Sequence, residues 1–337
     1  MKRFFLSLLI VATSVSWTVR TTGLDTNLRG ISIVSKKQGR TDTTIWASGS
    51  HGVVLRSVNG GKDWESLTVP QAESLDFRGI QAFSENEAYI MSSGEGGQSR
   101  IYKTTDGGKN WEMQYTDKRK GFFLDGLACL SATNCYALSD PVNGKFLLLR
   151  TEDGNTWKEL PGDKMPDALP KEGAFAASNT SLLLAAPKEI YFATGGPAAR
   201  VFHSFDSARS WTVVETPVLS GKAPQGIFSL AKLGDIIVAV GGDYEQPSVT
   251  ERSAAYSLDH GKTWLRPGSF PGGYRSAVVR STKEFIAVGP TGADISRDGV
   301  TWRPIKGPAL NAVAFDEDGG WAVGTKGTIV ECLKNKP

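Results

Sequence analysis

The protein has 337 residues and a formal net charge of +3; hydrophobic residues make up 40% of the chain and charged residues 22%. This balance excludes a disordered chain and a multi-span membrane protein, and the low net charge argues against nucleic-acid binding, which needs concentrated positive charge. The 38 glycines and 9 tryptophans favour an all-β fold with many tight turns and large packing side chains.

The first 16 residues have the layout of a secretory signal peptide. Two basic residues at positions 2 and 3 precede a short apolar run that ends near Ala12, and small residues at positions 12, 14 and 16 offer cleavage sites. The run is too short to span a bilayer, because a spanning helix needs about 20 apolar residues. A buried first strand is the alternative. We expect export to a periplasm or a comparable lumen, and no membrane span after cleavage.

A turn pattern of the form S/T-x-D/N-x-G-x-x-W, twice shortened by one residue, recurs six times at propeller-blade spacing. From tryptophan to tryptophan the copies are 47, 46, 54, 53 and 38 residues apart. In such a turn Asp or Asn accepts hydrogen bonds from backbone amides, Gly adopts the required positive φ, and Trp packs against a neighbouring sheet. The six pairs are Asn59 and Trp64, Asp106 and Trp111, Asp153 and Trp157, Asp206 and Trp211, Asp259 and Trp264, and Asp298 and Trp302.

This pattern resembles the Asp-box, or BNR repeat, of sialidase-like β-propellers. The resemblance implies a propeller in which each box is the turn between the third and fourth strands of a blade. We interpret the six boxes as structural; the alternative is six independent ligand or metal sites.

Seven repeat units can be aligned, although there are only six boxes. Their first strands are expected to begin at Gly30, Gly79, Gly126, Gly173, Gly226, Ser276 and Ala312. The seventh unit stops without a fourth strand, and residues 16–22 resemble residues 210–216, which belong to a fourth strand. We therefore predict a single seven-bladed β-propeller whose ring is closed by an N-terminal strand, which removes exposed sheet edges. The expected ranges are 1–16 for the signal peptide, 17–333 for the propeller, 334–337 for a tail, and 28–70, 77–116, 123–160, 173–216, 226–268, 273–305 and 309–333 with 17–22 for the blades.

Cys129 and Cys135 flank the first hairpin of the third unit. Their cross-strand proximity in an exported protein predicts a disulfide; the alternative is two small buried thiols. Cys332 is expected to be a small apolar or free thiol. The cysteines lack C-x-x-C spacing and the three histidines fall in three different units. We therefore expect no metal and no cofactor.

The loops that enter the first strands, and those that join second and third strands, are expected on one face, opposite the boxes. Pockets belong at this mouth, where strands of many blades converge. The residues immediately before the first strands are Arg29, Arg78, Asp125, Glu172, Gln225, Arg275 and Asn311, so three arginines are expected on one side and two carboxylates on the other. The loops between second and third strands add His51, Glu95, Arg100, Asp140, Arg200, Asp243, Tyr244, Glu245 and Lys326.

Three arginines facing two carboxylates could bind a carboxylated sugar, because a guanidinium group forms two parallel hydrogen bonds with a carboxylate. Sialidases use such an arginine triad with an acidic residue and a tyrosine nucleophile. Their Phe/Tyr-Arg-Ile-Pro motif is missing here, and Phe77-Arg78-Gly79-Ile80 matches it only in part. The hypotheses for the mouth are a solvated rim of charges, a surface that contacts a protein or ligand, and a sialidase-like active site.

The unit W-x-x-G-x-x-G-x-(I/V)-L-x-(S/T)-x-(D/N)-G-G-K-x-W is visible from Trp46 to Trp64, and its first half begins again at Trp321. In this unit, and over nearly the whole mature chain, the sequence resembles the photosystem II stability/assembly-factor family of exported propellers. The resemblance implies a scaffold that holds a membrane-protein precursor in photosynthetic organisms, with the partner open in relatives elsewhere. We expect a monomeric, non-enzymatic scaffold that binds a protein partner and no nucleic acid. The alternatives are a sialidase-like glycoside hydrolase and a carbohydrate-binding propeller.

Overall fold

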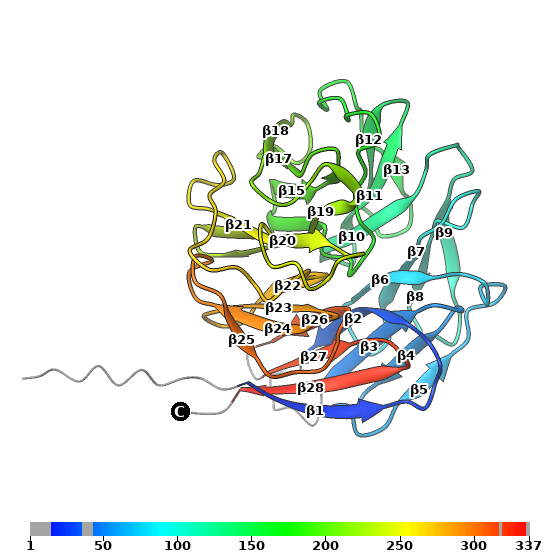
Figure 1. Cartoon of the computed structure of the whole chain (residues 1–337). Helices are drawn as coiled ribbons and strands as arrows, with labels where there is room; N and C mark the ends of the chain where they lie inside the picture. Colours follow the sequence, from blue (N-terminus) through cyan, green and yellow to red (C-terminus); the bar gives the residue numbers. More distant parts are fainter. Residues whose placement is uncertain (1–14, 36–42, 317–318, 335–337) are drawn as a thin grey trace, which may run out of the picture.

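The chain folds into a closed ring of seven antiparallel β-sheets, as its computed structural model shows for residues 15–35, 43–316 and 319–334 (Figure 1). Each sheet has four strands and forms one blade. The seven-bladed propeller expected from the repeats is therefore confirmed. The expected signal peptide falls almost entirely on residues 1–14, which lie outside the described residues. Within the described part of the chain, no helix is long and apolar enough to cross a membrane.

In the first four blades the strands follow one another in chain order from the centre of the ring to its rim. Blade one contains β2 (Leu28–Val34), β3 (Thr44–Gly49), β4 (Val54–Ser57) and β5 (Glu65–Leu67); blade two contains β6 (Phe77–Ala82), β7 (Ala88–Ser92), β8 (Arg100–Thr104) and β9 (Glu112–Thr116). Blade three contains β10 (Leu124–Ser131), β11 (Asn134–Val142), β12 (Lys145–Thr151) and β13 (Lys158–Glu159); blade four contains β14 (Leu182–Ala186), β15 (Glu189–Ala193), β17 (Arg200–Ser204) and β18 (Thr212–Glu215).

Blade five departs from this plan. Its outer strand is reduced to a single bridge between Tyr256 and Leu265, and a short strand that follows β15 pairs with its innermost strand instead. Blade five contains β16 (Gly195–Gly196), β19 (Lys222–Leu233), β20 (Ile236–Asp243) and β21 (Ala254–Ser257). Blade six contains β22 (Ala277–Arg280), β23 (Phe285–Gly289), β24 (Gly292–Ser296) and β25 (Arg303–Ile305).

Blade seven joins the two ends of the described chain. It contains β26 (Ala312–Phe315), β27 (Gly319–Val323), β28 (Thr328–Lys334) and, as its outer strand, β1 (Val15–Thr21). Strand β1 pairs with β28 in antiparallel register, with Trp17 opposite Cys332. Figure 1 shows the two strands side by side at the closure point. Because the fourth strand of this blade comes from the N-terminal side, no turn joins it to the third strand, which explains six turns for seven blades.

The second strand of every blade is buried, since it lies between neighbouring blades. The apolar clusters lie between adjacent blades, and the tryptophan of each recurring turn packs toward the preceding blade. Trp302 of blade six lies with Val238 and Val240 of blade five, and Trp64 of blade one meets Trp321 of blade seven at a ring distance of 6.0 Å. The turn tryptophans therefore hold neighbouring blades together.

The recurring turns use the hydrogen bonds that their sequence predicts. In the turn of blade two, Thr104 Oγ1 accepts the amide of Gly108 at 2.9 Å, and Asp106 Oδ1 accepts the amide of Asn110 at 2.9 Å. The glycine leaves room for the neighbouring blade: at Gly299, with φ of +73°, an added Cβ would lie 2.6 Å from Val238 Cγ1.

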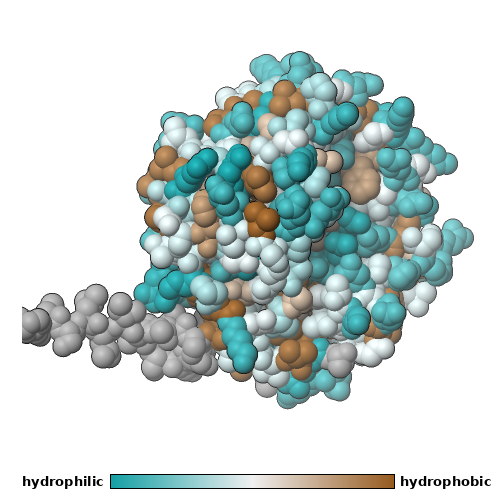
Figure 2. Space-filling model, in the orientation of Figure 1, coloured by the Kyte–Doolittle hydropathy of each residue, from teal (hydrophilic) through white to brown (hydrophobic). Residues whose placement is uncertain are grey.

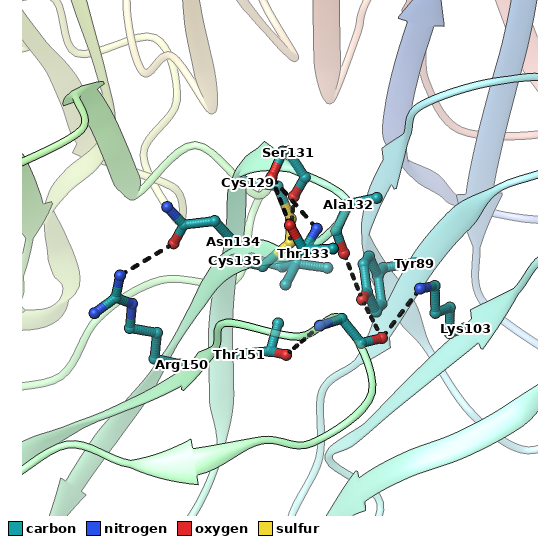
Figure 3. Close-up of a disulfide and its surroundings, with 12 residues drawn as sticks. Tyr89, Lys103, Cys129, Ser131, Ala132, Thr133, Asn134, Cys135, Arg150 and Thr151 are labelled. Atoms are coloured by element: carbon teal, nitrogen blue, oxygen red, sulfur yellow. Dashed lines mark hydrogen bonds between the residues drawn. A yellow bond between two sulfur atoms is a disulfide. The ribbon is translucent and has the colours of Figure 1, made fainter.

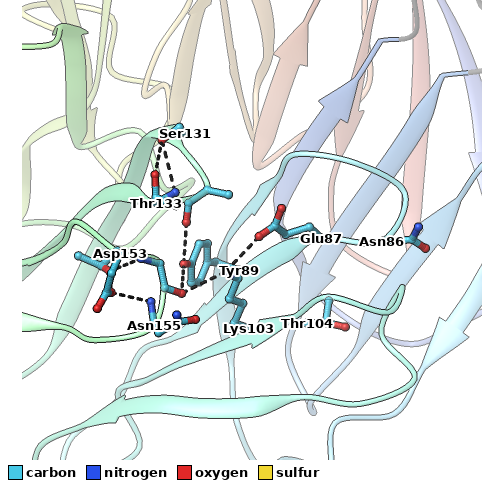
Figure 4. A network of polar contacts seen from close by, with 12 residues as sticks. Asn86, Glu87, Tyr89, Lys103, Thr104, Ser131, Thr133, Asp153 and Asn155 are labelled. Atoms are coloured by element: carbon cyan, nitrogen blue, oxygen red, sulfur yellow. Dashed lines mark hydrogen bonds and ion pairs between the residues drawn. The ribbon is translucent and has the colours of Figure 1, made fainter.

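A disulfide joins Cys129 of β10 to Cys135 of β11, which are paired across the first hairpin of blade three (Figure 3). Tyr89 of blade two donates its hydroxyl toward the carbonyls of Ala132, at 2.9 Å, and Gly154, at 2.7 Å. Lys103 donates to Gly154 and forms an ion pair with Glu87, both at 3.0 Å (Figure 4). The hairpin tip is thus tied to blade two. Cys332 is a buried thiol that takes no part in the disulfide.

Candidate functional site

A cavity of about 530 Å³ opens where the first strands begin, at the end of the ring opposite the recurring turns. We call it the mouth cavity. On the face shown in Figure 2, hydrophobic residues are scattered among hydrophilic ones rather than gathered in one large patch. The mouth cavity is lined by Arg29, Arg78, Phe123, Asp125, Asp140, Ala174, Phe175, Ala176, Ala177, Phe228, Tyr244, Tyr274, Ser276, Pro290 and Asn311.

Four lining side chains stand at β-bulges of first strands. The pairing with the second strand skips one residue in blades one, two, three and five, and the skipped residues are Arg29, Arg78, Asp125 and Phe228. A bulge adds an unpaired residue and re-aims its side chain. The bulges thereby place two cations, an acid and an aromatic ring around one opening.

Strand pairing also corrects the alignment made from sequence. The second strand of each blade gives a common reference, because the residue near its end pairs with an equivalent residue of the first strand. The residues that directly precede this first-strand residue are, in blades one to seven, Arg29, Arg78, Asp125, Thr180, Phe228, Ser276 and Asn311. The expected positions Glu172, Gln225 and Arg275 are wrong in blades four, five and six. In blade four the first strand begins at Leu182 rather than near Gly173, because the entering loop is longer there.

The three misplaced residues form polar pairs within the wall of the ring. Glu172 pairs with Arg200 of β17. Gln225 Nε2 donates to Asp243 Oδ2 at 3.0 Å. Arg275 Nε donates to Asp294 Oδ2 at 2.6 Å, with both side chains buried. The predicted group of three arginines is therefore reduced to Arg29 and Arg78.

Of the predicted residues in loops between second and third strands, Asp140 and Tyr244 line the mouth cavity. The others do not: Arg200 and Asp243 lie in the wall pairs, and Arg100 donates to the carbonyl of Gly97 at 2.8 Å. The remaining members, His51, Glu95, Glu245 and Lys326, are not among the lining residues.

An aromatic cluster, of which sequence inspection found only Tyr244, forms one side of the cavity. Phe175 stacks on Phe228 with ring centres 3.8 Å apart and planes 13° apart. Tyr244 and Tyr274 meet Phe228 edge-on at 6.1 and 4.7 Å. Tyr274 stands next to Arg275 in the chain, so an alignment shifted by one residue would have found it. Burial raises the pKa of Tyr274, which keeps its hydroxyl neutral.

Arg29 and Arg78 share one carboxylate. Arg78 Nε donates to Asp76 Oδ2 at 2.8 Å, whereas Arg29 Nε lies 3.9 Å from the same oxygen. The Nε of Arg29 is buried and has no hydrogen-bond acceptor among the residues that the structure describes. Burial, and then the charge of Arg78, lower the pKa of Arg29. One positive charge is thus in excess at this side of the cavity.

Asp125 and Asp140 form an acidic pair, which we call the carboxyl pair. Burial, and then the charge of Asp140, raise the pKa of Asp125 well above its usual value, and burial raises the pKa of Asp140. Asp140 Oδ1 accepts the amide of Ala174 at 2.8 Å. Asp125 is 1% exposed, and among the described residues Asp140 is the only hydrogen-bonding neighbour of its carboxyl group. The pair therefore holds a proton to a higher pH than ordinary aspartates do.

The thermal unfolding midpoint is expected to be highest at about pH 4 to 5 and to fall on both sides. A raised pKa, as in the carboxyl pair, contributes stability at low pH that is lost as the pH rises through the raised value. A lowered pKa works in the opposite direction: hydrogen bonds from the amide and side chain of Asn110 lower the pKa of Asp106 to about 2, and this contribution is lost as the pH falls through that value. Melting curves from pH 2 to pH 8 measure both effects.

Asp125→Asn is the informative variant for this profile, because it removes one titrating group of the pair and preserves its size. We expect its midpoint to decline less than that of the wild type between pH 5 and pH 8. If the midpoints of the variant and the wild type fall equally between pH 5 and pH 8, the carboxyl pair is not the cause of the decline.

Two further observations limit the chemistry of the site. Among the described residues, no group of three or more His, Cys, Asp or Glu side chains is arranged to hold a metal ion. A second hollow, of about 690 Å³, lies at the other end of the central channel and is lined largely by apolar residues of the first strands, such as Ile31, Leu184 and Val313. Its lining also includes Glu189, Lys232 and Arg280, and Lys232 is paired with Glu189 at 2.6 Å.

Comparison with known proteins supports the architecture. A family profile described as "DUF6242 beta propeller domain" matches residues 11–307. The comparison with curated protein sequences gives no match.

Solved structures show the same fold. The chain is similar to "YCF48 bound to D1 peptide", with 16% identity, coverage of 95% of this chain and 97% of that chain, and a TM-score of 0.64. It is similar to YCF48 from Cyanidioschyzon merolae, with 17% identity, coverage of 94% and 98%, and a TM-score of 0.62. It is also similar to virginiamycin B lyase from Staphylococcus aureus, with 13% identity, coverage of 96% of this chain and 100% of that chain, and a TM-score of 0.68. At these identities the likeness concerns the fold alone.

Proposed function

The chain belongs to the DUF6242 β-propeller family, and from that premise we propose that it is an exported, monomeric, non-enzymatic scaffold that binds a segment of a partner protein in the mouth cavity. The observation that carries the proposal is the cavity itself: a rigid ring aims an aromatic cluster, an excess positive charge and a carboxyl pair at one opening. Aromatic and arginine side chains dominate the energetics of protein contacts, and recognition usually resides in loops on a rigid scaffold.

A solved relative in fold supports peptide binding as a use of such a ring. The structure titled "YCF48 bound to D1 peptide" contains a peptide on a propeller of similar size. We propose that the present chain is similar to the photosystem II assembly factors in this respect, with a partner of its own. We also propose that the six recurring turns are Asp-box repeats of the sialidase-like type, which the hydrogen bonds of Asp106 support.

Export is supported by two features. The N-terminal residues have the composition of a signal peptide, and the bond between Cys129 and Cys135 is of a kind that persists in oxidising compartments. The intact mass of the protein isolated from its own cells tests this part of the proposal, because export with cleavage removes about 16 residues.

The hydrolase alternative depended on Arg29, Arg78 and Arg275 facing Asp125 or Glu172. Arg275 is paired with Asp294 and Glu172 with Arg200, so that arrangement is not formed. A carbohydrate ligand remains the second candidate, because Tyr244 is 48% exposed beside the cavity and aromatic faces suit sugar rings.

Photo-crosslinking from Tyr244 tests the proposal. With benzoylphenylalanine at this position, we expect covalent adducts with a partner protein in the native cells, because the side chain lies at the cavity rim. Adding Arg78→Gln should reduce the adduct about fivefold or more, since a charge-assisted contact is lost. Gel shift and mass spectrometry of the adduct measure both.

Phe205 gives a matched control. It is 45% exposed, close to the 48% of Tyr244, but it lies in a recurring turn, at the opposite end of the ring. The same adducts from both positions, or none from Tyr244, would overturn the proposed docking site. An adduct that contains a sugar rather than a protein would support the carbohydrate alternative.

A further inference from the structure

Among the described residues the carboxyl pair, Asp125 and Asp140, forms no ion pair, unlike two other buried carboxylates of the wall. Glu172 is matched by Arg200 and Asp294 by Arg275. Asp125 is as buried as Asp294, at 1% exposure, but among the described residues Asp140 is its only hydrogen-bonding neighbour, and its side chain lines the mouth cavity. A buried carboxyl group that faces another carboxyl group instead of a cation is costly, and at a cavity it marks a candidate functional site.

Resting on the proposed function, we propose that the carboxyl pair is the subsite for a primary ammonium group, such as that of a lysine side chain of the bound segment. An ammonium group has three N–H donors and no acceptor. It can donate to the carboxyl oxygens of Asp125 and place its charge beside Asp140. The ligand thereby supplies the partner that the wall lacks.

The surroundings favour an organic cation over a metal ion. A calcium ion takes six to eight oxygen ligands, and among the described residues no third acidic, histidine or cysteine side chain joins the pair in such a group. Phe123 and Phe175 line the same cavity and can cover the methylene stem of a lysine side chain, whose charged end then reaches the carboxyl pair.

Charged groups on the neighbouring elements set the pH dependence. From β6, the charge of Arg78 favours the ionised form of Asp125, and Asp76 partly offsets Arg78. On the blade-four side, Glu172 is neutralised by Arg200, and Lys171 shares a shallow hollow with Asp140. The dominant effect is burial, so the empty pair holds a proton to a higher pH than ordinary aspartates do, and binding of a cation favours its release. Affinity for the ammonium group should therefore rise with pH.

Two probes with uncharged backbones isolate this contact: N-acetyl-lysine amide and N-acetyl-norleucine amide, which keeps the four side-chain carbons and lacks the ammonium group. Both are titrated against the full-length protein by NMR. At pH 8 we expect the lysine probe to bind about tenfold or more tightly than the norleucine probe, and the ratio to fall toward one by pH 5, since release of one proton changes affinity up to tenfold per pH unit. Asp125→Asn should remove the preference at pH 8.

Asp163→Asn is the matched control, because Asp163 is exposed and outside the cavity; it should keep the preference. If Asp125→Asn does not fold, Asp140→Asn and the wild-type pH series carry the test. Equal affinities of the two probes at pH 8, no binding of either, or a preference that survives in Asp125→Asn overturns the inference. Crosslinking from Tyr244 without lysine preference leaves the proposed function standing, whereas lysine preference without protein adducts separates the subsite from that function.

Discussion

Trp302→Ala is expected to lower the free energy of unfolding by about 3–5 kcal/mol, the range for truncation of a buried aromatic residue. Trp302 is 3% exposed and packs with Val238 of blade five and Phe285 of blade six. Its Nε1 donates to the carbonyl of Gly299 at 3.2 Å. Truncation therefore leaves a cavity between two blades and an unpaired carbonyl. Urea unfolding followed by tryptophan fluorescence and circular dichroism measures the loss.

Trp111→Ala is the matched comparison, because Trp111 occupies the same place in the turn of blade two. Trp111 is only half-buried, its Nε1 has no acceptor, and its ring meets Trp46 edge-on at 6.3 Å. We expect a smaller loss there, since less apolar surface leaves water on folding. Equal losses at the two positions would mean that the turn, rather than contact with the preceding blade, determines the contribution of the tryptophan.

The fold could be predicted from sequence because its determinants are local and repeated. A turn needs a polar residue, a glycine and a large apolar residue at nearly fixed offsets, and five of the six copies have all three. In blade four Ala208, with φ of +67°, takes the place of the glycine. Ring closure could also be predicted, because the segment around Trp17 resembles the fourth strand around Trp211. The structure starts that strand at Val15, two residues before the expected propeller start.

The mouth could be predicted only where blades keep a common register. In blades one, two and three a glycine follows the bulged residue: Gly30, Gly79 and Gly126. In blade four the glycine chosen from sequence, Gly173, stands eight residues before Ser181, which occupies the aligned position. Loop length, unlike turn chemistry, leaves no local signature that fixes the register.

Most of the aromatic cluster was missed for a different reason. In sequence, Phe175, Phe228 and Tyr274 look like ordinary core residues, and an aromatic residue in a strand is more often core than ligand contact. What distinguishes Phe228 is the bulge at its position, which appears only when strand pairing is known. The same pairing shows that Arg275 belongs to the wall.

The buried pair of Arg275 and Asp294 shows what that wall placement means for stability. The two side chains are 2% and 1% exposed. Arg275 Nη1 also donates to Thr291 Oγ1 at 2.7 Å and to the carbonyl of Tyr274 at 2.9 Å. Asp294 additionally accepts the amide of Gly272 at 3.2 Å. The pair thus joins the loop that enters blade six to its third strand, directly behind Tyr274.

Arg275→Met is expected to lower the free energy of unfolding by about 3–5 kcal/mol, because it leaves Asp294 as a buried charge without its cation. Arg297→Met is the control: Arg297 pairs with Glu284 at 2.9 Å but is 55% exposed, and loss of an exposed pair costs about 0–1 kcal/mol. Combining Arg275→Met with Asp294→Leu should recover most of the loss, since both charges are then removed. Urea unfolding of the wild type, the two single variants and the double variant measures these differences in the free energy of unfolding. If Arg275→Met costs no more than the control, or if the second substitution recovers nothing, the charge of Asp294 is not what makes the pair necessary, and Arg275 contributes through its packing and its bonds to Thr291 and Tyr274 instead.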